Sequence, residues 1–146
     1  MTNVVPKATQ KINSLALSMA REISQGNMQP AECPVVHRFA DNCYLREILM
    51  PKGTLIVGKI HKTQHFNVIL TGSCSVYTRD GVEHYTAPAT FISDAGVQKV
   101  VLCHEDVRWQ TLHVTDKTDL AEIEKDVIEE TDTQIEVLEI MQRCLS

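Results

Sequence analysis

The chain has 146 residues, 43% of them hydrophobic, and its 19 acidic and 14 basic side chains give a formal charge of −5. This length and apolar fraction fit one ordinary domain with a hydrophobic core. Residues 116–146 hold ten acidic and three basic side chains, a net −7, which leaves +2 for residues 1–115. Neither part is basic enough for a duplex nucleic-acid binder, and no apolar run approaches the roughly 20 residues that cross a bilayer. We therefore expect a soluble protein that binds neither duplex nucleic acid nor a membrane.

The five cysteines are Cys33, Cys43, Cys74, Cys103 and Cys144. They are odd in number and contain no CxxC pair, which argues against both a disulfide framework and a zinc ribbon. We interpret them as mostly buried thiols.

An amphipathic helix is predicted within residues 9–25, where apolar side chains recur at helical spacing and Gly26 follows to end it. From residue 35 to residue 113 the pattern changes to short β-type runs separated by turn residues. Eight strands are predicted, at residues 44–50, 54–60, 66–70, 73–78, 82–85, 90–93, 97–103 and 107–114. The strongest local signal is a hairpin around Asp80-Gly81, a pair suited to a type I′ turn. Short strands without helices between them predict an antiparallel sandwich or barrel.

Two acidic helices are predicted after Thr115. Asp119 and Glu122 are spaced as a capping box for the first, and Thr131 and Gln134 form a similar pair for the second. The predicted domains are an N-terminal helical arm at 1–32, a β-barrel at 33–115 and acidic C-terminal helices at 116–146. The terminal helices have apolar stripes that could pack on the barrel or against the same helices of another copy.

Residues 58–72 read GKIHKTQHFNVILTG. They resemble the first sequence motif of the cupin superfamily, in which a glycine leads to histidines on one strand, a carboxylate on the next and a closing glycine. The resemblance implies a mainly β, single antiparallel jelly-roll barrel, here with an N-terminal helix and one or two acidic C-terminal helices. The interior of such barrels often holds a metal ion on two or three imidazoles and a glutamate. Side chains two residues apart on a strand point the same way, so they can converge there.

Aligned on the closing glycine, Gly72, the chain places His61 at the family's second histidine and His65 at its glutamate. Lys59 then stands at the first histidine, and Lys99 stands at the last histidine of the second motif. A lysine ammonium has no lone pair for a metal ion. The chain therefore departs from the usual metal site of the family.

A closer resemblance, covering about residues 33–128, is to small cupin proteins encoded by tailed bacteriophages. It includes the segments PVVHRF, YLRE, GKIHK, PATF, HEDVRW and HVT. The resemblance implies a phage origin, and hence a location in the host cytoplasm or in the virion. It implies no particular activity, because fold alone does not supply one.

The alternating set Lys59, His61, His65 and Asn67 could share one barrel face, either as a pocket or as a solvated strand surface. His113 shares a strand face with Trp109 and could supply a third imidazole, or could be a hydrogen-bonded structural residue. Arg46 could clamp an anion, or it and Glu47 could pair across strands. The predicted ligand-binding residues are Lys59, His61, His65, Asn67, Lys99, Arg46 and Trp109. The predicted metal ligands are His61, His65 and His113.

Three functions follow as hypotheses. The first is binding of a small anion, such as a nucleotide signal or a sugar-like molecule, in a barrel where cations replace metal ligands. The second is an oligomeric virion component that binds other phage proteins. The third is a metal-dependent cupin enzyme using His61 and His65 with a divalent transition metal; no common catalytic motif supports an enzyme more directly. We also expect a homo-oligomer, a dimer or larger, because a jelly roll has edge strands to cover.

Overall fold

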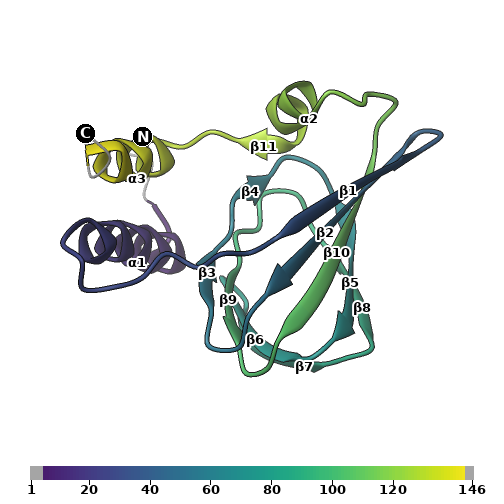
Figure 1. The fold of residues 1–146 in the computed structure, drawn as a ribbon. Helices are drawn as coiled ribbons and strands as arrows, with labels where there is room; N and C mark the ends of the chain where they lie inside the picture. Colours follow the sequence, from purple (N-terminus) through teal and green to yellow (C-terminus); the bar gives the residue numbers. More distant parts are fainter. Residues whose placement is uncertain (1–4, 144–146) are drawn as a thin grey trace. The chain divides into compact units, whose positions relative to one another are not determined.

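The computed structural model describes residues 5–143, so Cys144 and Leu145 lie outside the described residues. The chain divides into two compact units: residues 31–129, and residues 1–30 with residues 130–146. The first unit contains the β-barrel and the second contains a pair of helices (Figure 1). This division differs from the expected domains, because residues 116–129 belong with the barrel rather than with the last helix.

The barrel consists of antiparallel sheets. The larger sheet has the order β1-β2-β10-β5-β8, the smaller one β3-β9-β6-β7, and β11 pairs with β4 in a third sheet of two strands. The strands are β1 (Val35–Ala40), β2 (Cys43–Met50), β3 (Leu55–Val57), β4 (Ile60–His61), β5 (His65–Thr71), β6 (Ser73–Thr78), β7 (Gly81–Thr86), β8 (Ala89–Ser93), β9 (Val100–Cys103), β10 (Val107–Val114) and β11 (Ile128–Glu129). The expected mainly β, antiparallel jelly roll with terminal helices is confirmed.

The predicted strand at residues 54–60 is divided into β3 and β4. The backbone N–H of Gly58, between them, donates to the carbonyl of Lys99 at 2.8 Å. A Cβ on Gly58 would lie 3.1 Å from that same oxygen. After this close approach the chain changes its pairing partner, because β3 pairs with β9 whereas β4 pairs with β11.

The predicted β-hairpin is present, but its turn is shifted by one residue. Thr78 pairs with Gly81, so the loop residues are Arg79 and Asp80 rather than Asp80-Gly81. Neither loop residue has a positive φ, whereas Gly81 has φ 112°. The type I′ turn was therefore wrong: the left-handed freedom of the glycine is used at the first residue of β7, after the turn.

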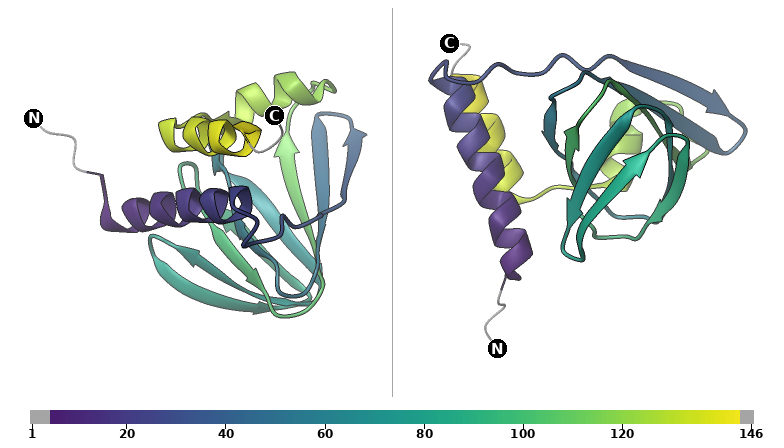
Figure 2. Two further views of the ribbon diagram at one scale, coloured as in Figure 1. Left: turned by 60° about the vertical axis from the view of Figure 1, so that its left-hand side comes forward. Right: turned by 90° about the horizontal axis from the view of Figure 1, so that it is seen from below.

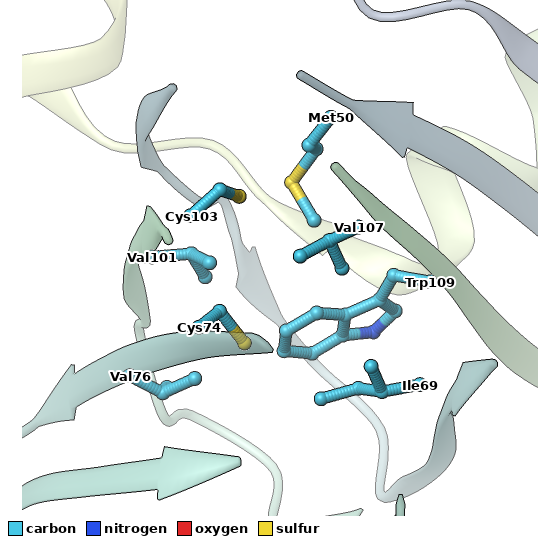
Figure 3. Close-up of a cluster of buried hydrophobic side chains, with 8 residues drawn as sticks. All are labelled: Met50, Ile69, Cys74, Val76, Val101, Cys103, Val107 and Trp109. Carbon is cyan, nitrogen blue, oxygen red and sulfur yellow. The ribbon is translucent and has the colours of Figure 1, made fainter. Parts of the chain in front are cut away.

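The core lies between the two larger sheets (Figure 3). Its buried residues are Met50, Ile69, Cys74, Val76, Val101, Cys103, Val107 and Trp109. Strand β10 shows the period of two that produces this core, because its residues from Val107 to His113 alternate between buried and more exposed positions. Cys74 and Cys103 are free thiols on paired strands, and burial raises the pKa of Cys103 to about 11. They are structural apolar residues, as expected.

The second unit contains α1 (Lys7–Ser24) and α3 (Asp132–Arg143), which contact each other. They lie side by side in the second view of Figure 2. Ile12 and Ala20 of α1 are buried, and Gly26, with φ 78°, follows the helix as predicted. The Thr131 hydroxyl accepts from the Gln134 N–H at 3.2 Å, which confirms the predicted start of α3. Within residues 5–143, no helix is long and apolar enough to span a membrane.

Candidate functional site

Three histidines from three strands meet inside the barrel unit. His61 comes from β4, His65 from β5 and His113 from β10. Their ring centroids are 4.3 Å apart for His61 and His65, 5.4 Å for His61 and His113, and 5.2 Å for His65 and His113. The fold thus brings together all three imidazoles that were predicted as metal ligands.

Each of these rings has a buried nitrogen without a hydrogen-bond partner among the described residues: Nδ1 of His61, Nε2 of His65 and Nδ1 of His113. The Nδ1–H of His65 donates to the carbonyl of Thr63 at 3.0 Å. That bond fixes the tautomer, because a neutral imidazole has one donor and one acceptor nitrogen. Nε2 of His65 therefore presents a lone pair to the interior.

All three imidazoles are held neutral. Burial lowers the pKa of His61 to about 3 and that of His113 to about 4, and it also lowers the pKa of His65. The charge of Lys99 acts in the same direction on all three rings, and that of Arg46 acts on His61 and His113. The interior therefore favours groups that bring negative charge, and it disfavours additional protons.

Helix α2 (Leu120–Val127) and β11 close this end of the barrel (Figure 1). The Asp119 carboxylate caps α2 by accepting from the Glu122 N–H at 3.1 Å, as predicted. Ile123 and Val127 are buried on the underside of the helix in a cluster with Tyr44. The ring of Tyr44 in turn stacks on His113, with centroids 6.0 Å apart.

Backbone pairing holds this closing segment on the strand that carries His61. Ile128 of β11 is the register partner of His61, and the Lys62 N–H donates to the Val127 carbonyl at 2.7 Å. The histidines therefore lie beneath a cover formed by residues of the acidic tail. Nothing in the spacing of the sequence indicated this cover, although the apolar pair Ile123 and Val127 showed that one face of the helix had to be buried.

The charge of Lys99 acts on all three imidazoles, and Lys99 also lines a cavity of about 130 Å³ whose wall includes none of the three histidines. The cavity wall also includes Ser93, Tyr85 and Phe91, and Asp80, Glu83 and Asp94 contribute carboxylates to it. Burial lowers the pKa of Lys99 to about 8, and no carboxylate among the described residues forms an ion pair with it. The cavity is smaller than the roughly 300–1,000 Å³ of pockets for drug-sized molecules, so it suits a small ligand.

The structure does not bring Lys59 into this group. Its side chain is half exposed and its ammonium bonds to Glu124 of α2 at 2.5 Å. Of the set expected to alternate, only Lys59 fails to join the interior, because it precedes the first residue of β4, Ile60. Counting by twos is valid only within one strand.

Asn67 and Trp109 do lie inside the barrel, but they bond to each other. The indole N–H of Trp109 donates to Oδ1 of Asn67 at 3.0 Å, and Nδ2 of Asn67 donates to the Ser93 hydroxyl at 2.8 Å. Their polar atoms are thus occupied in supporting the wall beside the cavity. Glu47, weighed as a partner for Arg46, instead faces Arg38 at 3.4 Å and Arg108 at 3.9 Å.

The three histidines provide the type of ligand that a metal ion needs, but they are not arranged as a metal site. Unpartnered imidazole nitrogens are the ligands that late divalent transition metals prefer. Among residues 5–143, however, no group of three or more His, Cys, Asp or Glu side chains is arranged to hold a metal ion. The charges of Lys99 and Arg46 also oppose a bound cation.

Comparisons with known proteins support the fold. No protein-family model matches the chain, and no curated protein matches its sequence. Among solved structures, an RmlC-like cupin from Shewanella frigidimarina has a TM-score of 0.50 and 15% identity, over 64% of this chain and 89% of that one. The EutQ protein of Clostridium difficile has a TM-score of 0.50 and 8% identity, over 60% of this chain and 71% of that one. The likeness is one of fold: the barrel is of the cupin type.

Proposed function

We propose that this cupin-fold protein binds a small hydroxylated anion, of the class of sugar phosphates and nucleotides, at Lys99 beside the three histidines. The observation that carries the proposal is the position of Lys99. It is a partly buried cation without an ion-pair partner among the described residues, it lines the cavity, and its charge acts on every imidazole of the cluster. A charge that is partly removed from water is more stable when it is paired, so an anionic ligand would supply the missing partner of Lys99.

The remaining groups favour a ligand that also carries hydroxyls. Nε2 of His65 has a lone pair that can accept from an O–H but cannot donate to an oxyanion. The Asp94 carboxylate on the cavity wall can likewise accept from a hydroxyl, although it already accepts from Gln64 at 3.0 Å. Arg46 adds a second cation near His61 and His113. A ligand with one anionic group and neighbouring hydroxyls would match this distribution.

Thermal-shift and calorimetric titrations with ribose 5-phosphate, inorganic phosphate and ribose test this proposal. We expect the sugar phosphate to stabilise the protein most, phosphate less, and ribose alone not measurably. Lys99→Met should weaken binding of the sugar phosphate by about tenfold or more, since a hydrogen bond to a charged group contributes about 1.5–3 kcal/mol. Lys59→Met makes the same chemical change at a half-exposed lysine outside the cluster, and it should bind as the wild type does.

Ligand-free Lys99→Met gives a folding control. Removing a partly buried ammonium that has no ion-pair partner should leave the melting temperature equal to or above that of the wild type. Equal binding by the two lysine variants, or no shift of the wild-type protein with either anion, would contradict the proposal.

A metal-dependent activity is the second candidate, favoured by the three unpartnered nitrogens and the close spacing of the imidazoles. Any ion would have His61, His65 and His113 as its ligands. Elemental analysis of untagged protein tests it directly. The anion proposal predicts less than about one metal ion per ten chains, whereas a resident metal requires near-stoichiometric content.

The oligomer, phage origin and virion partners stay predictions. One feature supports self-association: Phe66 and Ile92 are register partners on the outer face of the larger sheet, and they are 49% and 55% exposed. Apolar side chains that lie together on a surface are typical of contact sites between proteins.

A further inference from the structure

A second histidine cluster lies on the outer face of the smaller sheet. The Ser75 hydroxyl of β6 is 2.6 Å from Nδ1 of His84 and 2.6 Å from Nε2 of His104. Ser75 and His84 are register partners on β6 and β7, and His104 directly follows β9 on the other side of β6. Both imidazoles are exposed. Two rings from opposite neighbouring strands therefore point at the same oxygen.

The number of protons available to this cluster is limited. A serine hydroxyl carries one proton, so it can donate to only one of the two nitrogens. The other imidazole must donate its own N–H to the hydroxyl oxygen. With the proton on Nε2 of each ring, His84 accepts through Nδ1 and His104 donates through Nε2. Moving the proton of His104 from Nε2 to Nδ1 would leave two imidazole lone pairs directed at the position of Ser75.

We propose that His84 and His104 form a surface site for a divalent late transition-metal ion such as Zn²⁺, bound between the two rings near the Ser75 hydroxyl. Such ions prefer neutral imidazole nitrogens, at about 2.0–2.1 Å for zinc. The two nitrogens already converge to hydrogen-bond distance from one atom, so small rotations of exposed side chains bring them to a common ion. Water molecules complete the coordination, as an open surface allows.

The electrostatic surroundings of this site favour a cation, unlike those of the interior cluster. The Ser73 hydroxyl donates to Oε1 of Glu105 at 2.6 Å, which places a carboxylate two residues along β6 from Ser75. The described residues contain no group of three or more His, Cys, Asp or Glu side chains that could hold a metal ion. The site proposed here has only two protein ligands. The inference does not depend on the proposed anion site.

Calorimetric titration of the metal-free protein with Zn²⁺ at pH 7.5 tests the inference. The wild type should show a binding event that His84→Gln and His104→Gln each weaken by about tenfold or more, since each variant removes one of two protein ligands. His37→Gln is the matched control, because His37 is also exposed but lies on β1 of the larger sheet. It should leave the event unchanged. His61→Gln should also retain it, which separates the surface event from any zinc bound in the interior.

Histidine footprinting on the wild type gives a readout that requires no substitution. Zn²⁺ should protect His84 and His104, but not His37, from modification by diethyl pyrocarbonate, as read by peptide mass spectrometry. The inference is overturned if both variants titrate like the wild type, or if zinc leaves the modification of these two histidines unchanged.

Discussion

Gly72→Ala is expected to prevent most of the protein from folding. Gly72 joins β5 to β6 with φ 89°, a conformation that disfavours any residue with a Cβ. The added Cβ would lie 2.2 Å from the carbonyl oxygen of Asp106 and 3.1 Å from the Cα of Val107. Both obstacles are backbone atoms beside the buried start of β10, so no side-chain rotation can relieve the contact. We expect a cost of about 3 kcal/mol or more, a large share of the 5–15 kcal/mol that stabilises an ordinary domain.

Gly53→Ala separates the contact from the cost of the backbone angle. Gly53 has a similar φ of 84°, but a Cβ there would meet nothing within 4 Å. Its replacement should therefore cost only about 1–2 kcal/mol, the left-handed penalty alone. Soluble yield, near-ultraviolet circular dichroism and urea midpoints compare the two variants. Equal losses at the two positions would show that the approach of Asp106 does not limit this turn.

This glycine also explains why the cupin resemblance could be recognised from the sequence. The motif begins at Gly58 and closes at Gly72, and in the structure a Cβ at either one would crowd a backbone carbonyl, that of Lys99 or that of Asp106. Close approaches of this kind restrict the residue type strongly, so they leave a readable pattern. The inward-facing set on β10 was predictable for a similar reason, because the period of two holds over an unbroken strand.

The contents of the two histidine clusters could be predicted only in part. His61, His65 and His113 were chosen from the motif and from strand alternation, and they do meet. His84 and His104 were not, because 20 positions of sequence separate them and they meet only through the pairing of β6 with both β7 and β9. Pairing of distant strands depends on how the whole sheet closes, and local spacing carries no record of it.

Acidification is the second change with a large expected effect, and it should destabilise the metal-free protein well before carboxylates protonate. The folded-state pKa values of His61 and His113 are about 3 and 4, and that of His65 is also lowered, against 6.5 in the unfolded chain. The unfolded state therefore binds more protons below pH 6.5. The resulting stability is complete above pH 6.5, and it is lost progressively as the pH falls from there toward 3–4. Each histidine contributes a slope of at most about 1.4 kcal/mol per pH unit, so three give at most about 4.

Urea unfolding at pH 7, 6 and 5 in the presence of EDTA measures this slope. Carboxylates ordinarily protonate below pH 5, so they contribute little to the slope between pH 7 and pH 5. The pKa of Glu47 is lowered, first by its hydrogen bond from Gln110, so its contribution to stability is lost only below pH 5. His113→Gln should remove about one third of the slope whatever its effect on stability at pH 7, because it deletes one of three suppressed protonations. A free energy of unfolding that stays constant between pH 7 and pH 5 would mean that the three imidazoles are protonated as readily in the folded protein as in the unfolded chain.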